Sequence, residues 1–393
     1  MSKSVVIVGG GVIGLCTAYY AARRGHRVTV VERDNTRRNG CSYGNAGMIV
    51  PSHFVPLAAP GMMALGLKWM WHPESPFRIK PRLDPALMAW CWRFMRCATQ
   101  SHVERSAPLL RDLSFASRGL FEELAEKSEN AFGLVRKGLL MLCHTPEALS
   151  HEIQNAETAH KLGVAAEILD AAQTAHLEPN IKMDIAGSVH FPQDCHLTPA
   201  RFMDFMQRES AKAGVRFIWE TESNNWRTKG RRIAALQTGQ GELEADEFVL
   251  CAGAWSPSIA KSLRLRLPVQ AGKGYSLTLP QPPCLPGICS ILVEARVAVT
   301  PMGGALRFGG TMEFDGLDER MDPRRVRGII KSSLKFFPEM RAEDFANVKP
   351  WAGLRPCSPD GLPYLGRAKA WDNLSVCTAH AMMGLSLGPV SGE

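Results

Sequence analysis

The stretch from Ser4 to Arg33 reads SVVIVGGGVIGLCTAYYAARRGHRVTVVER and carries the clearest indication of a fold in the chain. An apolar run over residues 5–8 predicts a buried strand, and a glycine turn follows it. The spacing of apolar residues over 12–24 predicts a helix that ends before Gly25, and residues 27–32 predict a second strand. The stretch therefore predicts a βαβ unit.

The glycine turn has the pattern Gly-x-Gly-x-x-Gly, formed by Gly9, Gly11 and Gly14. The first glycine permits a tight turn, the second lets a pyrophosphate approach the backbone, and the third lets helix and strand pack closely. Glu32 ends the second strand, where an acidic side chain can accept hydrogen bonds from ribose hydroxyls. Because an acid at this place disfavours a 2′-phosphate, we expect NAD or FAD rather than NADP. The alternative is a glycine turn beside a surface glutamate, with no ligand.

Length and composition exclude several classes of protein. A chain of 393 residues is too long for one ordinary core, so we expect two interleaved domains. With 45% hydrophobic and 21% charged residues and no repeat of fixed period, disordered and solenoid proteins are disfavoured. The formal charge of +8 is spread along the chain, so it permits an anionic partner but selects none.

The cysteines and the start of the chain bear on location. The eleven cysteines include no Cys-x-x-Cys pair, which argues against a disulfide framework or a metal site and predicts a reducing compartment. The opening residues MSKS lead directly into the first strand, so we expect no secretory signal. No window of eighteen uninterrupted apolar residues predicts a membrane span. We therefore expect a cytoplasmic protein.

The remainder of the chain predicts two interwoven regions. Residues 51–150 have helical runs and no alternating strand pattern. Thr198 suits the N-cap of a helix that ends at Gly214, and strands are expected over 215–220 and 247–256, the first of them joining the N-terminal sheet. Residues 297–314 predict a hairpin that turns at 303–304, and 374–379 predict a further strand.

Five further motifs follow, of which CSYGNAGMI and VLCAGAWS favour FAD over NAD. They are CSYGNAGMI at 41–49, APGMMALGLKWMW at 59–71, VLCAGAWS at 249–256, KGYSLT at 273–278 and WAGLRPCSPDG at 351–361. With these motifs in this order, the chain resembles the D-amino-acid oxidase superfamily of FAD enzymes over essentially its whole length. It is most similar to the bacterial D-amino-acid dehydrogenases.

The resemblance implies an α/β protein in which a Rossmann-type FAD-binding domain is interleaved with an α+β substrate-binding domain built on a largely antiparallel sheet. Residues 1–50, 196–256 and 350–393 would form the FAD-binding domain, and 51–195 and 257–349 the substrate-binding domain. The cofactor-binding residues predicted from the motifs and the resemblance are Gly9, Gly11, Val12, Ile13, Gly14, Glu32, Arg33, Ser42, Asn45, Ala46, Gly47, Met48, Ala252, Gly253, Trp255, Gly353, His380, Met383, Gly384 and Leu385.

The resemblance further implies that the loop AHAMMGLSLGP, residues 379–389, lies against the flavin pyrimidine ring. The family commonly has Gly-His-Gly here, whereas this chain has Ala379 and Ala381 on either side of His380. The family's final helix would begin about where the present sequence ends.

Three residues are predicted to face the substrate. Arg355 is a cation among Trp, Leu and Pro, and the resemblance implies that it holds the substrate carboxylate; the alternative is a surface arginine with a buried stem. His53 and Tyr275 would lie near the substrate, although each could equally be a hydrogen-bonded structural side chain. Cys357 could carry a covalent flavin link, but a free buried cysteine is the preferred interpretation.

The activity implied by the resemblance is the oxidative deamination of a D-amino acid. The α-hydrogen would leave as hydride to flavin N5, the imino acid would hydrolyse to a 2-oxo acid and ammonia, and a quinone or another respiratory-chain acceptor would take the electrons. The alternatives are a D-proline or hydroxy-D-proline dehydrogenase and a glycine- or sarcosine-type amine oxidase that uses oxygen. An RNA-binding module is disfavoured, because the sequence has no arginine-rich stripe, and no nucleic-acid partner is expected.

A tryptophan-rich region bears on the electron acceptor. Trp69, Trp71, Trp90 and Trp92 are interleaved with Lys68, Arg93 and Arg96. Such a region suits either a peripheral contact with the inner face of the cell membrane or ordinary helix packing, and packing is the preferred interpretation.

Overall fold

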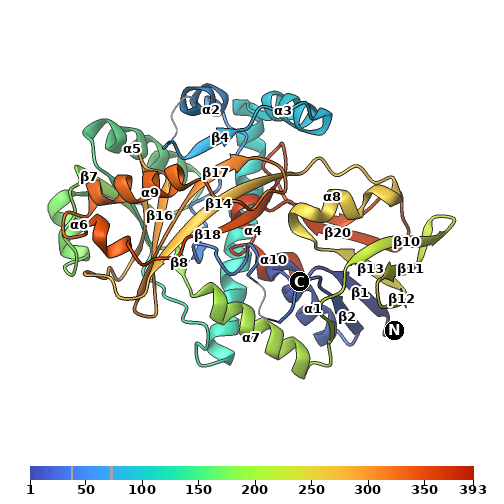
Figure 1. The fold of residues 1–393 in the computed structure, drawn as a ribbon. Coiled ribbons are helices and arrows are strands. Elements are labelled where there is room, and N and C mark those ends of the chain that lie inside the picture. Colours follow the sequence, from blue (N-terminus) through green and yellow to red (C-terminus); the bar gives the residue numbers. More distant parts are fainter. Residues whose placement is uncertain (37–38, 71–73) are drawn as a thin grey trace.

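The computed structural model describes residues 1–36, 39–70 and 74–393, and two large β-sheets organise it (Figure 1). The first sheet has six strands in the order β19-β20-β13-β1-β2-β9. Its strands are β1 (Ser4–Val8), β2 (Arg27–Val31), β9 (Arg216–Ile218), β13 (Glu247–Leu250), β19 (Tyr364–Arg367) and β20 (Leu374–Thr378). All neighbouring pairs are parallel except β19 with β20. With helix α1 (Val12–Arg23) between β1 and β2, the predicted βαβ unit is confirmed, and so is the pairing of β9 with this sheet.

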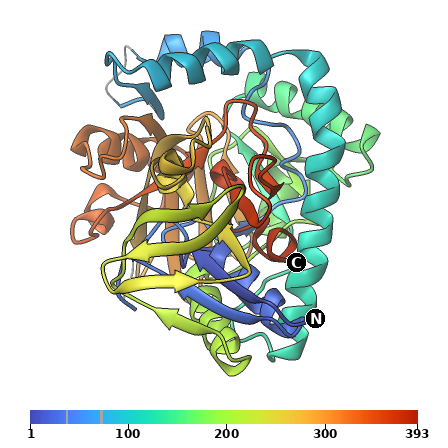
Figure 2. The ribbon, with the colours of Figure 1, turned by 90° about the vertical axis from the view of Figure 1, so that its right-hand side faces the viewer.

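Helices cover one face of this sheet and a small sheet covers the other. The helices are α1, α4 (Gln100–Lys127), α7 (Pro199–Lys212) and α10 (Gly388–Gly392). Figure 2 shows α4 running along one side of the molecule. On the opposite face lie β10 (Ser223–Lys229), β11 (Arg232–Thr238) and β12 (Gly241–Glu244), where Trp226 packs edge-on against Phe248. Helix α7 is the one predicted after Thr198, but the Thr198 side chain makes no capping hydrogen bond.

The second large sheet is mostly antiparallel and has the order β18-β14-β17-β16-β15-β5-β7-β6, with β4 paired to β17. Its strands are β4 (Phe77–Ile79), β5 (Leu139–Cys143), β6 (Glu167–Asp170), β7 (Gly187–Phe191), β14 (Gln270–Leu279), β15 (Cys289–Leu292), β16 (Val297–Met302), β17 (Ala305–Phe314) and β18 (Trp351–Cys357). The predicted hairpin turn at Gly303 and Gly304 joins β16 to β17. Helices α5 (Pro146–Lys161) and α9 (Pro323–Phe336) contribute buried residues to the cores on this sheet.

Two features of this sheet differ from the sequence expectations. Strands β4 and β5 lie in the region where the sequence pattern predicts only helices, of which α2 (Met62–Met70), α3 (Pro85–Cys97) and α4 are present. Four of the five residues of β5, LLMLC, are buried, so its sequence lacks the alternation of a half-buried strand. Strand β18 lies in the range predicted for the FAD-binding domain, yet it pairs with β14. The domain boundaries themselves stay a prediction.

Two histidines near the junction of the sheets are buried without charge. His196, in β8 (Cys195–His196), is 2% exposed and His380 is 3% exposed. In the described part of the chain neither Nδ1 atom has a hydrogen-bond partner. Burial lowers the pKa of His196 to about 4, with a further contribution from the charge of Lys137, and burial lowers the pKa of His380 to about 3. Both rings are therefore neutral at pH 7.

These histidines predict a loss of stability in acid. Between pH 6.5 and about 4 the unfolded His196 binds a proton and the folded one does not, so the free energy of unfolding falls as the pH falls. We expect His196→Gln to remove roughly 1 kcal/mol per pH unit of this dependence. Chemical denaturation at stepped pH measures the slope. The exposed His176 provides the control, since His176→Gln should leave the slope as it is; equal slopes for all three proteins would contradict the prediction.

Candidate functional site

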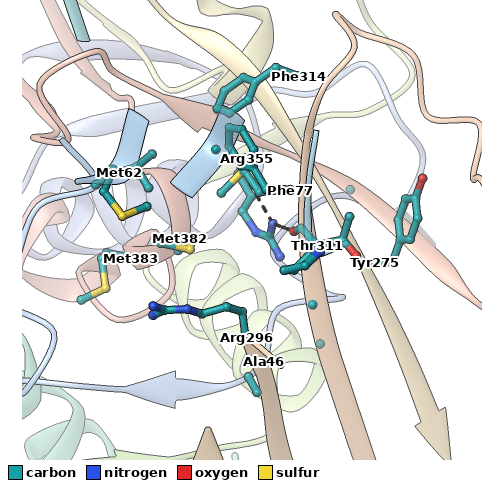
Figure 3. A pocket seen from close by; sticks show the side chains of 18 of the residues that line it. Ala46, Met62, Phe77, Tyr275, Arg296, Thr311, Phe314, Arg355, Met382 and Met383 are labelled. Carbon is teal, nitrogen blue, oxygen red and sulfur yellow. Dashed lines mark hydrogen bonds between the residues drawn. The ribbon is translucent and has the colours of Figure 1, made fainter. Parts of the chain in front are cut away.

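Two adjoining cavities border the second large sheet. The larger has a volume of about 870 Å³ and is lined by the glycine turn, the end of β2 and the loop after β13. The smaller, of about 570 Å³, lies between the second sheet and the segment that contains α2, β4 and α3 (Figure 3). Cys41 and Asn45 line both cavities. A molecule in the larger cavity would therefore meet one in the smaller at these two residues.

The glycine turn shapes the larger cavity. Gly9 has a φ of +109°, and a Cβ atom there would lie 2.6 Å from the carbonyl oxygen of Cys251. A Cβ atom on Gly14 would overlap the carbonyl oxygen of Gly9. On Gly11, by contrast, a Cβ atom would meet only Ser42 Oγ, at 3.5 Å, and Gly11 lines the cavity. The turn thus packs tightly on the protein side and leaves space on the cavity side.

Polar groups around this space suit a dinucleotide. Helix α1 has Gly11, which has no side chain, as its N-cap residue, and its first N–H, that of Val12, donates to Ser42 Oγ at 3.0 Å. No acidic residue lies in its first turn, which favours an anion at its N-terminus. The carboxylate of Glu32 accepts hydrogen bonds from the backbone N–H groups of Gly10, at 2.5 Å, and Asp34, at 3.0 Å. It is thereby fixed at the end of β2, facing the cavity. These residues fit the pyrophosphate and ribose groups of the FAD predicted from the motifs.

The structure brings most of the predicted cofactor residues to the two cavities. Gly9, Gly11, Val12, Ile13, Glu32, Arg33, Ser42, Asn45, Ala252, Gly253, Trp255, His380, Gly384 and Leu385 line the larger cavity. Asn45, Ala46, Met48, Gly353 and Met383 line the smaller one. Gly14 and Gly47 line neither, because each packs against a neighbouring backbone carbonyl, that of Gly9 and that of Leu197 respectively.

The loop after β20 lines both cavities, and two of its alanines have the positive φ values that glycine favours. Ala379 and Ala381, which replace the family's two glycines, have φ values of 66° and 49°. The left-handed conformation costs an alanine roughly 1–2 kcal/mol. The departure from Gly-His-Gly therefore changes the residues but keeps the backbone path that glycine favours. Nε2 of His380 lies within hydrogen-bond distance of Ser391 Oγ, at 2.9 Å.

Arg355 lies in the smaller cavity in a position set by its neighbours. Its Nη1 atom donates a hydrogen bond of 2.7 Å to the carbonyl oxygen of Thr311. A Cβ atom on Gly274 would overlap the guanidinium, so the group rests directly on the backbone of β14. Thr311 lies in a bulge of β17, where the register jumps from Glu313 opposite Lys273 to Gly310 opposite Tyr275, and has a φ of 70°.

The remainder of the smaller cavity is mostly apolar, with a second arginine. Its apolar walls include Met62, Met63, Phe77, Ile79, Phe94, Met312, Phe314, Met382 and Met383. Arg296 and Arg355 both line it, and none of the described residues around it is Asp or Glu. The cavity is therefore cationic and favours a substrate that carries negative charge.

Tyr275 borders the same cavity, but its hydroxyl is bonded elsewhere. The hydroxyl donates to the carboxylate of Glu313 and accepts from the backbone N–H of Asp322, at 3.0 Å. Figure 3 shows the hydroxyl pointing away from the guanidinium of Arg355. Glu313 also pairs with Arg325 at 2.9 Å and lies 3.7 Å from Lys273. The hydroxyl of Tyr275 thus belongs to a buried charged cluster beside the cavity.

His53 faces the smaller cavity as a neutral ring. Burial and, to a lesser extent, the charge of Arg296 lower the pKa of His53 to about 4. Its Nδ1 lies 3.1 Å from Ser52 Oγ, which in turn donates to the carboxylate of Asp194. Asp194 is 1% exposed, and burial raises its pKa to about 7. A chain of hydrogen-bonding groups therefore leads from the cavity into the interior.

The remaining predicted residues have structural surroundings. Cys357 is fully buried and lines neither cavity, and burial raises the pKa of its thiol to about 12, so a covalent flavin link gains no support. Trp90 is packed, and its indole N–H donates to the carbonyl oxygen of Cys357 at 2.9 Å. Trp69 lines the smaller cavity and Trp92 is 52% exposed. Trp71 and the side chain of Lys68 lie outside the described residues.

Comparison with known proteins identifies the family. A family model described as FAD dependent oxidoreductase matches residues 4–393. The D-amino acid dehydrogenase of Granulibacter bethesdensis is 31% identical, with 99% of this chain and 94% of that protein covered. That of Methylobacterium radiotolerans is 33% identical, with the same shares covered. The structure of glycine oxidase from Geobacillus kaustophilus superposes with a TM-score of 0.77 at 24% identity and covers 100% of this chain and 92% of that one, which supports the α/β fold. The chain therefore belongs to the FAD dependent oxidoreductase family, and FAD is its cofactor.

Proposed function

We propose that this protein oxidises D-amino acids to 2-oxo acids and ammonia. The relatives named D-amino acid dehydrogenase, which match 99% of the chain, support this proposal. The observation that carries it is a positioned arginine, Arg355, in an apolar cavity that adjoins the dinucleotide site. When bound, FAD supplies the two-electron acceptor for the α-hydrogen, which leaves as hydride.

Arg355 is suited to hold the α-carboxylate. The bond to Thr311 fixes one nitrogen of the guanidinium, and within the described chain Nε and Nη2 have no hydrogen-bond partner. A planar guanidinium can bind a carboxylate through two parallel N–H donors, a geometry that lysine lacks. The methionine and phenylalanine walls keep water away, which strengthens the pair. The protein would thus orient the α-carbon while the cofactor performs the difficult step.

His53 would complete the substrate site as a neutral side chain. Because its pKa is about 4, the ring carries no charge at neutral pH and does not repel the substrate ammonium. Its unprotonated nitrogen can accept a hydrogen bond from the substrate nitrogen, and the reactive neutral amine needs no stronger base. Tyr275 has no direct role in this proposal, since its hydroxyl is bonded to Glu313 and the backbone of Asp322.

A substrate panel tests the proposal. D-amino acids, their L-enantiomers, D-proline, glycine and sarcosine would each be offered with a quinone-like dye and with oxygen as acceptor. We expect turnover of D-amino acids with the dye. Turnover confined to glycine and sarcosine, with peroxide formed in step, would favour an amine oxidase instead, and turnover confined to D-proline would favour the proline-type enzyme.

Replacement of Arg355 should abolish most activity without loss of cofactor. Removing one partner of a desolvated charge pair costs roughly 3–5 kcal/mol, so Arg355→Met should lower kcat/KM by about two to four powers of ten. Arg355→Lys should recover part of the loss. Steady-state kinetics with a D-amino acid and with its decarboxylated amine measure the effect, and FAD content follows from absorbance.

Glycines provide a second, independent test of this placement. Gly274→Ala should displace the guanidinium and lower kcat/KM, because the added Cβ overlaps it. Gly309→Ala is the matched control in the same cavity, since its Cβ would only touch Ala46 at 3.8 Å. If Arg355→Met affects the amino acid and the amine equally, or if the two alanine variants behave alike, Arg355 does not anchor the carboxylate.

Cofactor binding should depend on the space above Gly11. Gly11→Leu would place a side chain in the larger cavity, where a Cβ atom now meets only Ser42 Oγ, and should yield a folded protein without yellow colour. Gly119→Leu on helix α4 is a control, because its Cβ has no neighbour within 4 Å. Circular dichroism checks folding and absorbance measures FAD. A yellow Gly11→Leu protein with full FAD content would contradict the proposed binding site.

For the electron acceptor we propose a membrane quinone, reached through helix α3. None of the helices in the described ranges has the length and apolar content needed to span a bilayer. Helix α3 instead exposes Met88, Trp92 and Met95 at 63%, 52% and 49% on one face, while its opposite face is buried. Arg96 lies 4.8 Å from the Trp92 ring, and Arg93 is exposed nearby. Figure 1 shows α3 at the edge of the molecule, beside α2. Such a helix face suits an anionic lipid surface.

This surface can be tested with vesicles. We expect the protein to sediment with vesicles that contain anionic lipid and to reduce quinone embedded in them far faster than oxygen. Trp92→Ser with Met95→Ser should abolish sedimentation and quinone reduction but keep activity with a soluble dye. Leu109→Ser, at a residue 58% exposed on α4, is the matched control. Unchanged sedimentation of the double variant, or equal rates with oxygen and quinone, would overturn this part of the proposal.

A further inference from the structure

We infer that Arg296 forms a second anion-binding subsite, so that the preferred substrates are D-amino acids whose side chain ends in a carboxylate. This inference rests on the proposed function, because it assumes that Arg355 holds the α-carboxylate. It concerns the other end of the substrate, for which the sequence makes no prediction.

Arg296 reaches the smaller cavity from a turn. It is the last residue between β15 and β16, is exposed at the rim, and has a φ of 54°. Figure 3 shows its side chain extending toward Met382 and Met383, while the Arg355 guanidinium lies against Thr311. The two guanidinium groups therefore line one cavity at separate places. A substrate that binds both needs two anionic groups joined by a short chain.

The charge of Arg296 has no partner within the described protein. Its side chain makes no hydrogen bond or ion pair with any described residue, and no described Asp or Glu lines the cavity. Glu294, the acid in the same turn, is already committed, because its Oε1 atom accepts from the backbone N–H groups of His144 and Thr145, at 3.0 and 2.9 Å. Arg296 is thus a cation at the rim of a largely apolar cavity, available to pair with an anion from outside the chain.

Charge balance then selects among substrates. A D-amino acid with a neutral side chain brings one carboxylate, which would compensate Arg355 and leave Arg296 unpaired. A second carboxylate would compensate Arg296 and give the substrate a net negative charge that suits the cationic cavity. The cavity volume of about 570 Å³ leaves room for a side chain of this size. The match points to D-glutamate or D-aspartate rather than to D-alanine.

Isosteric substrate pairs isolate the second carboxylate. D-glutamate and D-glutamine differ only in the terminal group, as do D-aspartate and D-asparagine. For at least one of these two pairs, we expect the wild-type kcat/KM for the acid to exceed that for the amide by about tenfold or more. This is the factor typical of a charge-assisted hydrogen bond. In Arg296→Met this preference should fall to about one, because the value for the acid falls far more than the value for the amide. Arg264→Met is the matched control, because Arg264 is also exposed with a φ of 54° but lines neither cavity.

A binding measurement gives the same test without turnover. Glutarate, which has two carboxylates and no amine, should inhibit more strongly than butyrate, and Arg296→Met should remove that difference. Wild-type preference ratios near one, or a variant that slows acid and amide equally, would overturn the inference while leaving the proposed function intact. A wild-type enzyme that oxidises neither these substrates nor D-alanine would overturn the proposed function and this inference with it.

Discussion

The hydrogen bond from Arg355 to the carbonyl oxygen of Thr311 fixes the cation on which the proposed substrate geometry depends. A guanidinium in an apolar cavity needs a partner, and here the partner is a backbone group freed by a bulge in β17. Gly274 leaves the space in which the guanidinium lies. Below it, Glu313 pairs with Lys273 and Arg325. Because Glu313 is two residues beyond Thr311 on the same strand, this buried cluster holds the bulge in place.

Strand β17 also ties the substrate cavity to the cofactor cavity. Arg307, on the same strand, donates from Nη1 to the carbonyl oxygens of Tyr43 and Asn45, at 2.9 and 2.7 Å. Burial lowers the pKa of Arg307 to about 10, which still leaves it charged at neutral pH. The loop that contains Asn45 borders both cavities. One strand therefore positions both Arg355, the proposed carboxylate anchor, and the loop that borders the two cavities, so relative movement of the cavities would require this strand to shift.

The sequence predicts those parts of the fold that are formed by residues close together in the chain. The βαβ unit follows from the glycine turn between two apolar runs, and the hairpin turn from Gly303 and Gly304. Arg355 is marked as a candidate by its place among apolar residues, and the resemblance implies its role; the site residues as a set stay a prediction. Thr311 and Gly274 could not be predicted, because each gains its role from Arg355, which lies far away in the sequence. Arg296 could not be predicted either, because only the fold brings its turn to the cavity that Arg355 lines. Tyr275 is a similar case. Its place beside the cavity was predictable, but the direction of its hydroxyl depends on Glu313, a residue far away in the sequence.

Several residues with a strained backbone conformation line the two cavities. Thr311, Arg296 and Ala381 all have positive φ values and line a cavity, and Ala379, which also has a positive φ, lies two residues before Ala381. A β-branched residue such as Thr311 is the least suited to this conformation. This conformation is held in place because β17 pairs with β14, β16 and β4, and because Glu313 is fixed in the buried charged cluster. The strain at Thr311 is thus the cost of turning its carbonyl oxygen toward Arg355. A regular strand here would keep the sheet, but Arg355 would lose its hydrogen bond to Thr311.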